Sequence, residues 1–197
     1  MFKKLIILLG GIILMSQTPT ATAADDENTL ILQLSTGGPV VIEMKPDVAP
    51  KHVERIKTLA RQGFYNGVVF HRVIADFMAQ TGDPTGTGMG GSDLPDLEAE
   101  FNDIHHGRGA VSMARTNDPN TANSQFFVCF KDCGFLDKQY TVWGQVTEGM
   151  EHIDAVAKGE PPANPDKIVS MTIAADTAEK FEESANEPAT APSEAAE

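Results

Sequence analysis

Positively charged side chains are scarce in this sequence. Its 197 residues include 15 Lys and Arg against 28 Asp and Glu, so the formal net charge is −13. Proteins that bind nucleic acid or anionic membrane surfaces neutralise phosphate charge with Lys and Arg. The composition argues against both kinds of partner, and we interpret the acidity as a contribution to solubility.

Cysteine is almost absent, with only Cys129 and Cys133. Neither has a partner at a spacing typical of metal ligands, so the sequence predicts no metal site. Cys129 falls in an apparent strand, residues 126–130, where positions i and i+4 are too far apart for a disulfide unless the chain bends. We therefore predict two free thiols.

Apolar runs long enough to span a bilayer are lacking too. The N-terminal run from Leu5 to Met15 is shorter than the roughly 20 apolar residues that a transmembrane helix needs. Lys3 and Lys4 precede it, and the small residues that end at Ala23 suit a signal peptidase. We predict that residues 1–23 are a signal peptide, that the protein acts in the periplasm, and that no stable membrane association follows cleavage.

The C-terminal segment, residues 176–197, consists mainly of Ala, Glu, Pro, Ser and Thr, with Phe181 as its only aromatic residue. Such a segment cannot bury enough apolar surface to offset the entropy lost on ordering. We predict an acidic disordered tail. The remaining body, residues 24–175, is long enough for one domain with a substantial core.

Short β-rich runs recur along this body. Strands are predicted over residues 29–34, 40–44, 68–73, 77–81, 110–114, 126–130, 142–147 and 168–174. Val53, Ile56 and Leu59 form the apolar stripe of a helix over residues 49–62, and a second helix is predicted over residues 150–157. This pattern favours a mainly β fold, a closed eight-stranded antiparallel barrel with two capping α-helices.

Three motifs could indicate other chemistry. Gly86–Gly91 has the glycine spacing of dinucleotide-binding folds, but no helix start follows it, so we interpret it as a tight loop that needs positive φ. The adjacent pair His105–His106 could join a metal cluster, but neighbouring side chains in a polar loop point different ways, and we expect solvent exposure. A hydrolase would need Ser112 or Ser124 with a histidine such as His71, and the Gly-x-Ser-x-Gly elbow is missing.

The stretch from Phe70 to Asp83 contains two predicted strands joined by a three-residue turn. Alternation places Phe70 and Arg72 on one face of the first strand. It likewise places Met78 and Gln80 on one face of the second. A cation among apolar neighbours either has a function or lies over hydrophobic side chains with its charge in water, and the pattern alone leaves both open.

This stretch, Phe70–Asp83, resembles the signature of the cyclophilins, the peptidyl-prolyl cis-trans isomerases that bind cyclosporin. The similarity continues through four further motifs and covers most of the body: Gly82–Gly88, Ser112–Ala114, Asn123–Phe127 and Phe135–Asp137. The resemblance implies an eight-stranded antiparallel barrel with a helix at each end, in agreement with the strand pattern. It also implies catalysis of rotation about the peptide bond that precedes proline, with no cofactor and no metal.

The resemblance further implies the site residues. Arg72 would be the catalytic side chain, which stabilises the twisted amide as a hydrogen-bond donor without a covalent or acid/base step. The substrate-binding residues would be Phe77, Met78, Phe127 and Leu136 around the proline ring, with Gln80, Ala114, Arg115, Gln125, Phe135 and Tyr140 along the peptide groove.

Three positions depart from the family pattern. Phe135 stands where many cyclophilins have a Trp whose indole donates a hydrogen bond to cyclosporin, so we expect weak binding of the drug. Tyr140 stands where many relatives have His, and Arg115 replaces the usual Asn. These changes concern substrate preference rather than the reaction.

The sequence thus predicts a monomeric isomerase that accelerates X-Pro rotation in unfolded or partly folded polypeptides during the folding of exported proteins. Two other classes remain open. A binding module or chaperone would hold proline-containing segments in the same pocket, and loss of isomerisation in Arg72→Ala would separate it from the enzyme. An interaction protein would act through the acidic tail, which truncation after Ala175 would test.

Overall fold

The structure, a computed structural model, describes residues 27–177. The predicted signal peptide lies outside the described residues, as does all of the predicted tail except Asp176 and Thr177. The Asp176 carboxylate accepts three hydrogen bonds from the guanidinium of Arg61, at 3.3, 3.0 and 2.9 Å. Within the described range, no helix is long and apolar enough to cross a membrane.

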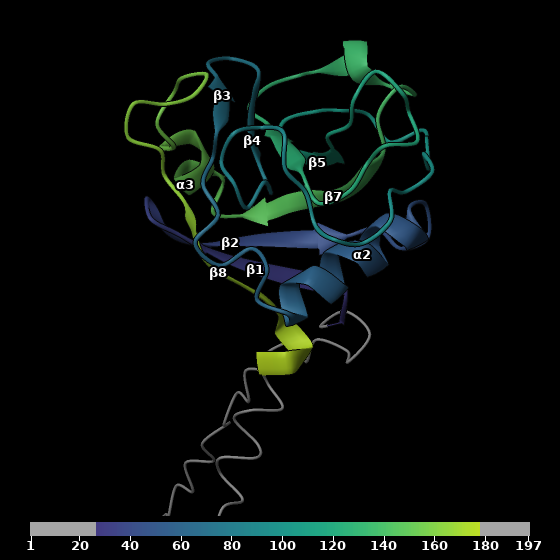
Figure 1. The fold of residues 1–197 in the computed structure, drawn as a ribbon, viewed down its shortest axis with the longest axis horizontal. Helices are drawn as coiled ribbons and strands as arrows, with labels where there is room; N and C mark the ends of the chain where they lie inside the picture. The colour runs from purple at the N-terminus through teal and green to yellow at the C-terminus, as the bar shows by residue number, and fades with distance from the viewer. Residues whose placement is uncertain (1–26, 178–197) are drawn as a thin grey trace, which may run out of the picture.

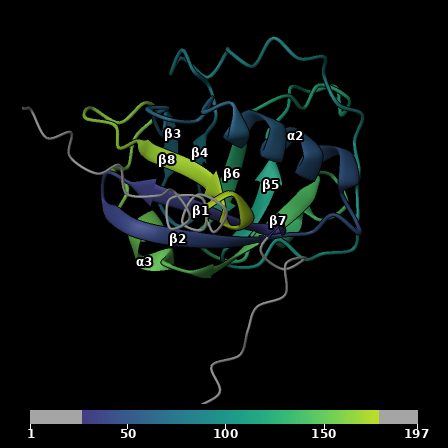
Figure 2. The same cartoon turned by 90° about the horizontal axis from the view of Figure 1, so that it is seen from below.

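Within residues 27–177, eight antiparallel strands and the helices α2 and α3 form the body of the fold, close to the predicted elements (Figure 1). The strands are β1 (Thr29–Leu34), β2 (Gly37–Met44), β3 (Arg72–Ile74), β4 (Met78–Thr81), β5 (Ala110–Met113), β6 (Phe126–Cys129), β7 (Val142–Glu148) and β8 (Ile168–Ile173). The helices are α2 (Pro50–Arg61), α3 (Met150–Asp154) and the short 3-10 helix η1 (Gly134–Leu136). α2 packs against β8 and α3 against β2, and the two helices lie on opposite sides of the strands (Figure 2).

The strands form one sheet in the order β3-β4-β6-β5-β7-β2-β1-β8, whose two end strands are not paired with each other. The prediction of a closed barrel is therefore wrong, and the sheet is an open half-barrel. The two ends of the sheet nevertheless approach each other, as two backbone hydrogen bonds between β8 and the segment before β3 show. Gly67 N donates to Ile168 O at 2.7 Å, and Ile168 N donates to Val68 O at 2.9 Å.

A loop accounts for the missing closure. Val73 in β3 exchanges two backbone hydrogen bonds with Gly159, each 2.8 Å long. Gly159 lies between α3 and β8, so this connection occupies the edge of β3 that would otherwise meet β8. Residues 68–71, predicted as strand, lie outside β3. Val69 forms an isolated bridge with Lys167, and Phe70 N donates to Asp166 O at 2.8 Å.

Helix α2 covers the main hydrophobic core with its predicted stripe of Val53, Ile56 and Leu59, each no more than 2% exposed. Full burial of each such side chain stabilises the fold by about 1.5–3 kcal/mol. The helix begins at Pro50, whose missing N–H would have no partner in a first turn. Glu100, from a distant loop, accepts the next free amides and complements the helix dipole.

Candidate active site

The β3–β4 hairpin positions Arg72. Arg72 and Gln80 are direct cross-strand neighbours, and Nη1 of Arg72 donates to Oε1 of Gln80 at 3.4 Å. Nε of Arg72 donates to Oε2 of Glu160 at 2.8 Å. With 42% of its side chain exposed, Arg72 is held from two sides and remains accessible to a ligand.

A relay of side-chain amides extends from Gln80 along the sheet. Nε2 of Gln80 donates to Oε1 of Gln125 at 2.9 Å. Nε2 of Gln125 in turn donates to the carbonyl oxygens of Gly88 and Gly90, at 3.1 and 2.8 Å. The relay therefore connects the strand beside Arg72 to the glycine-rich loop.

Buried Asp83 organises that loop. Its carboxylate accepts five hydrogen bonds from the loop's hydroxyl and amide groups, the shortest from Gly88 N at 2.6 Å. Burial alone raises the pKa of Asp83, but hydrogen bonds from Thr85 and from the amides of Gly90 and Gly88 lower it to about 2. A Cβ at Gly90 would collide with the Asp83 carboxylate, and Gly86 and Gly88 have φ of +68° and +83°. The interpretation as a tight loop with positive φ is confirmed.

A small apolar cluster, separate from the main core, lies beside Arg72 on the same face of its hairpin. Its buried members are Met78, Phe127, Cys129, Cys133 and Leu136, with Ile74, Phe77, Ala114 and Tyr140 packed against them. The strands β3, β4 and β6 and the helix η1 supply members of this cluster, and Ala114 directly follows β5. Met78 pairs with Cys129 across β4 and β6. The four residues predicted around a proline ring, Phe77, Met78, Phe127 and Leu136, thus belong to this one cluster.

Aromatic rings form the rim of the cluster. The Phe135 side chain is 66% exposed, and its ring lies 5.4 Å from that of Phe77. Tyr140 packs edge-on against Phe127 at 5.8 Å, and the guanidinium of Arg115 lies 4.2 Å above the Tyr140 ring. The two departures from the family pattern at Arg115 and Tyr140 therefore form a single stacked pair.

A cavity of about 390 Å³ adjoins this cluster. Its lining residues are Gln80, Gly88, Met89, Gly90, Gly91, Ser92, Asp96, Ala114, Arg115, Thr116, Thr121, Asn123 and Gln125. Ala114 and Arg115 adjoin both regions, and Arg72 is bonded to Gln80 of the cavity, so the eleven predicted site residues lie in one connected group.

Sequence reasoning missed several residues of this surface. Glu160 contacts Arg72 from 88 positions later in the chain, and no motif marks it. Asn123 holds the far side of the cavity, where its Oδ1 accepts from Ser92 N at 2.9 Å. The one sequence feature that could have indicated Ser92 as a cavity residue is its position directly after the glycine-rich loop.

The two adjacent histidines differ from each other. His105 has a side chain that is 54% exposed, as expected, but His106 is fully buried, so the expectation of exposure is wrong for His106. A carboxylate, Asp137, lies within hydrogen-bond distance of both rings and makes the burial of His106 possible. Residues 27–177 contain no group of three or more side chains that could hold a metal ion.

Both cysteines are buried free thiols, as predicted. Sγ of Cys133 donates to the carbonyl oxygen of Phe77 at 3.5 Å. Burial raises the pKa of both thiols, so they are poor nucleophiles at neutral pH.

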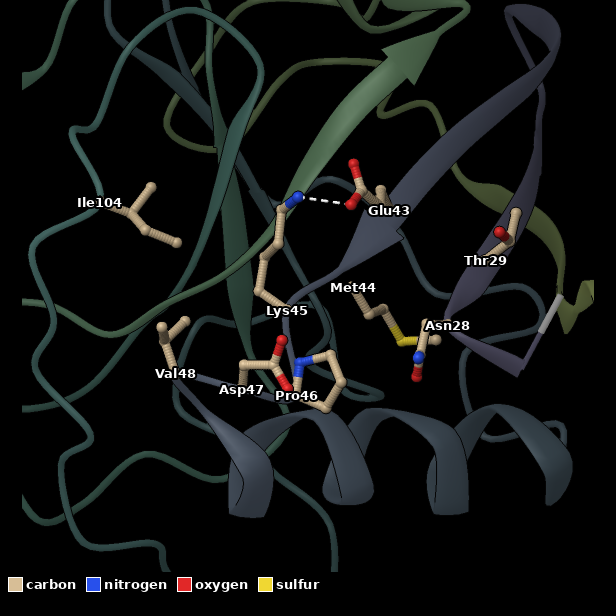
Figure 3. Close-up of a pocket in the computed structure, with 9 residues that line it drawn as sticks. All are labelled: Asn28, Thr29, Glu43, Met44, Lys45, Pro46, Asp47, Val48 and Ile104. Atoms are coloured by element: carbon tan, nitrogen blue, oxygen red, sulfur yellow. Dashed lines mark hydrogen bonds and ion pairs between the residues drawn. The ribbon is translucent and has the colours of Figure 1, made fainter. Parts of the chain in front are cut away.

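A second cavity, of about 480 Å³, lies at the start of α2 and contains none of the predicted site residues (Figure 3). Its lining includes Asn28, Pro46, Asp47, Val48 and Ile104. Lys45 points toward Glu43, and their charged atoms are 2.6 Å apart. This pairing occupies the ammonium group that an anionic ligand would need.

The chain is similar to known isomerases along most of its length. Residues 30–173 match the family described as "Cyclophilin type peptidyl-prolyl cis-trans isomerase/CLD". A "Probable peptidyl-prolyl cis-trans isomerase" of Brucella suis is 52% identical over 174 residues, which cover 80% of this chain and 88% of that protein. "Peptidyl-prolyl cis-trans isomerase-like 3" of Rattus norvegicus is 46% identical over 125 residues, 61% of this chain and 77% of the rat protein.

Solved structures agree. The cyclophilin AquaCyp293 from Hirschia baltica has a TM-score of 0.70 and 33% identity, and the match covers 76% of this chain and 74% of that one. A Cryptosporidium parvum cyclophilin, crystallised in the presence of the dipeptide Ala-Pro, has a TM-score of 0.68 and 28% identity, over 74% and 98% of the two chains. The family match, the relatives and the fold all lead to the conclusion that this chain belongs to the cyclophilin family of peptidyl-prolyl cis-trans isomerases.

Proposed function

We propose that Arg72 is the catalytic residue and that the apolar cluster beside it holds the proline ring of the substrate. The observation that carries this proposal is the position of the Arg72 guanidinium, which is bonded to Gln80 in β4. Gln80 lies opposite Phe127 in β6, and Met78 lies two residues before Gln80, so both cluster members share its face of the sheet. A proline ring in the cluster would bring the preceding amide within reach of this donor.

The chemistry requires a donor and a binding pocket. Amide resonance gives rotation a barrier of about 18–20 kcal/mol, and the uncatalysed X-Pro bond isomerises in tens to hundreds of seconds. As the bond twists, conjugation is lost and the nitrogen lone pair becomes a hydrogen-bond acceptor. A guanidinium that donates to this lone pair stabilises the twisted amide more than the planar one, and so lowers the barrier.

Arg72 suits this role because its charge is permanent and its donors are fixed in a plane. The contacts with Gln80 and Glu160 limit its orientations before substrate arrives, which reduces the entropy lost in the transition state. No proton is transferred and no covalent intermediate forms.

Proline-containing polypeptides are the proposed substrates. The dipeptide Ala-Pro was present in the crystals of the Cryptosporidium parvum cyclophilin, a protein of the same fold. In this chain the cavity beside the apolar cluster leaves room for residues next to the proline, so we expect peptides longer than a dipeptide to bind more tightly.

The test is the rate of isomerisation of a short Ala-Pro peptide by purified variants. Arg72→Ala should lower kcat/KM at least about 100-fold, a loss of roughly 2.7 kcal/mol of transition-state stabilisation. Arg72→Lys keeps the charge without the planar fork, so its kcat/KM should lie between those of the wild type and Arg72→Ala. Arg61→Ala is the matched control, because the Arg61 side chain is also 42% exposed and also pairs with a carboxylate.

If Arg72→Ala and Arg61→Ala both stay within about twofold of wild type, catalysis does not depend on Arg72. If Arg72→Ala binds the peptide with unchanged affinity while turnover is lost, the apolar cluster binds proline independently of Arg72, as the mechanism requires.

We further propose that the enzyme acts on exported polypeptides in the periplasm, as a monomer without a cofactor. The basis is the sequence of residues 1–23, with its Lys pair, apolar run and small residues before Ala24. Fractionation of cells that express the full chain, with mass determination of the purified product, tests this. A periplasmic product that begins near Ala24 would support it, and a cytoplasmic product that retains residues 1–23 would refute it.

A further inference from the structure

A buried chain of polar groups lies behind the apolar cluster. His106 is fully buried, with Nδ1 2.9 Å from Oδ1 of Asp137 and Nε2 3.1 Å from Oγ of Ser112. Oγ of Ser112 also lies 2.9 Å from the carbonyl oxygen of Thr141. The order carboxylate, imidazole, hydroxyl is that of a hydrolase triad, but Ser112 is fully buried and cannot reach a substrate.

This chain of polar groups, Asp137, His106, Ser112 and Thr141, touches the floor of the proposed proline pocket. The His106 ring is stacked on the Phe127 ring, with centroids 6.4 Å apart and planes 15° apart. Ser112 is the direct partner of Phe127 in the β5–β6 ladder. Phe127 therefore has His106 against its ring and Ser112 beside its backbone.

The same polar groups also fix the position of two walls of the pocket. Asp137 directly follows Leu136, the last residue of η1, and its Oδ1 accepts from the backbone N of His106 at 2.8 Å. Thr141 directly follows Tyr140, whose ring packs on the pocket floor. Movement of Asp137 or Thr141 would displace Leu136 or Tyr140.

Proton counting places a proton on Nδ1 of His106. The carboxylate of Asp137 only accepts hydrogen bonds, since the neighbouring His105 and the backbone N–H of His106 lower its pKa, so Nδ1 of His106 is the donor. The single hydroxyl proton of Ser112 is donated to the carbonyl oxygen of Thr141 at 2.9 Å. Nε2 of His106 contacts the same hydroxyl oxygen at 3.1 Å.

Burial favours the neutral ring. It lowers the pKa of His106, and the hydrogen bond with Asp137 opposes this only in part. The Asp137 carboxylate requires the proton on Nδ1 in either charge state of the ring.

We propose that His106 is a positioning residue for the isomerase: through its contacts with Asp137 and Ser112 it ties η1 to β5 and thereby keeps Phe127, Leu136 and Tyr140 in place to receive the proline ring. His106 itself does not touch the substrate. The inference rests on the proposed proline pocket, and its effect is on binding rather than on the donor Arg72.

The first test is a separation of KM from kcat. His106→Phe keeps a ring over Phe127 and removes both hydrogen bonds, so KM for the Ala-Pro peptide should rise about tenfold while kcat stays within about twofold. His106→Asn, whose Nδ2 can replace Nδ1 as donor to Asp137, should recover most of this loss. Ser112→Ala, which removes one bond, should raise KM about threefold.

His52→Phe is the matched control. His52 is also fully buried and also bonds a carboxylate, with Nδ1 2.6 Å from Oε2 of Glu100, but it lies in α2, away from the apolar cluster. It should lower Tm without a change in KM. If His106→Phe does the same, His106 is merely structural and the proposal is overturned.

A second readout does not depend on activity. The ¹⁵N NMR signals of His106 at pH 7 should show a protonated Nδ1, and an unprotonated Nδ1 would contradict the proposal. If His106→Phe fails to fold, unchanged KM in Ser112→Ala, together with an unprotonated Nδ1, overturns it.

Phe127→Ala separates this inference from the function on which it rests. A raised KM in Phe127→Ala with unchanged KM in His106→Phe would leave the proline pocket intact and reject the role of His106. Unchanged KM in Phe127→Ala would reject the pocket itself.

Discussion

Replacement of Asp83 by Asn should make the glycine-rich loop, and with it one side of the peptide groove, much less stable. The carboxylate accepts five hydrogen bonds in the native protein. Asn has nearly the same shape but only one acceptor oxygen, and its NH₂ group would face amides that are themselves donors. Asp83→Asn therefore resembles the protonated acid at every pH.

The size of the effect follows from the pKa. The folded-state pKa of about 2 lies below the ordinary value of 3.8, so the ionised group stabilises the fold by about 2 kcal/mol at neutral pH. Because the folded-state pKa is depressed, this stabilisation is fully present above pH 3.8 and is lost as the pH falls through 3.8 to about 2.

Urea unfolding at a series of pH values between 7 and 2.5 measures this directly. The wild type should be more stable than Asp83→Asn by about 2 kcal/mol at pH 7, and the difference should shrink steadily below pH 4. Asp93→Asn removes the same charge from an exposed position nearby and should behave like the wild type. A difference between wild type and Asp83→Asn that stays constant down to pH 2.5 would refute the reasoning.

Three further predictions concern the site. Glu160→Gln should change kcat/KM by less than about fivefold, because the ion pair with Arg72 is roughly half exposed and such pairs contribute at most about 1 kcal/mol; a loss above tenfold in the peptide assay would contradict this. Phe135→Trp should bind cyclosporin more tightly than wild type, since the indole supplies the donor that Phe lacks, and equal affinities by titration calorimetry would show that this position does not determine drug binding. Cys129 should react slowly with a thiol reagent at pH 8 in the native protein and rapidly in urea, because it is buried and its pKa is raised; fast reaction without urea would count against a closed pocket.

Local pattern carried much of the fold. Alternation placed Arg72 and Gln80 on defined faces of two strands joined by a short turn, and the structure pairs the two residues across β3 and β4. The apolar stripe predicted α2 within a residue at each end. The prediction of a closed barrel failed because closure depends on which segment pairs with the outer edge of β3. That partner is Gly159, and strand propensity contains no information about it.

The site was predictable only in part from the residues themselves. Alternation would have put Phe77 and Met78 on opposite faces, and their common cluster was predicted from the family resemblance alone. His106 was assigned to solvent because its loop is polar, whereas Asp137, 31 positions later, accepts its ring proton in the interior. Contacts of this kind depend on tertiary structure, which a single sequence does not report.

The sheet order also constrains how the molecule can assemble. β1, the first strand of the body, lies between β2 and β8, the last strand, so that Leu30 pairs with Ile173. A chain that is synthesised or translocated from its N-terminus therefore keeps one edge of β1 without a partner until nearly the whole body has emerged. Pairings between residues so far apart in sequence form slowly. An enzyme that accelerates the isomerisation of X-Pro bonds would thus depend, for its own native state, on the last strand to arrive.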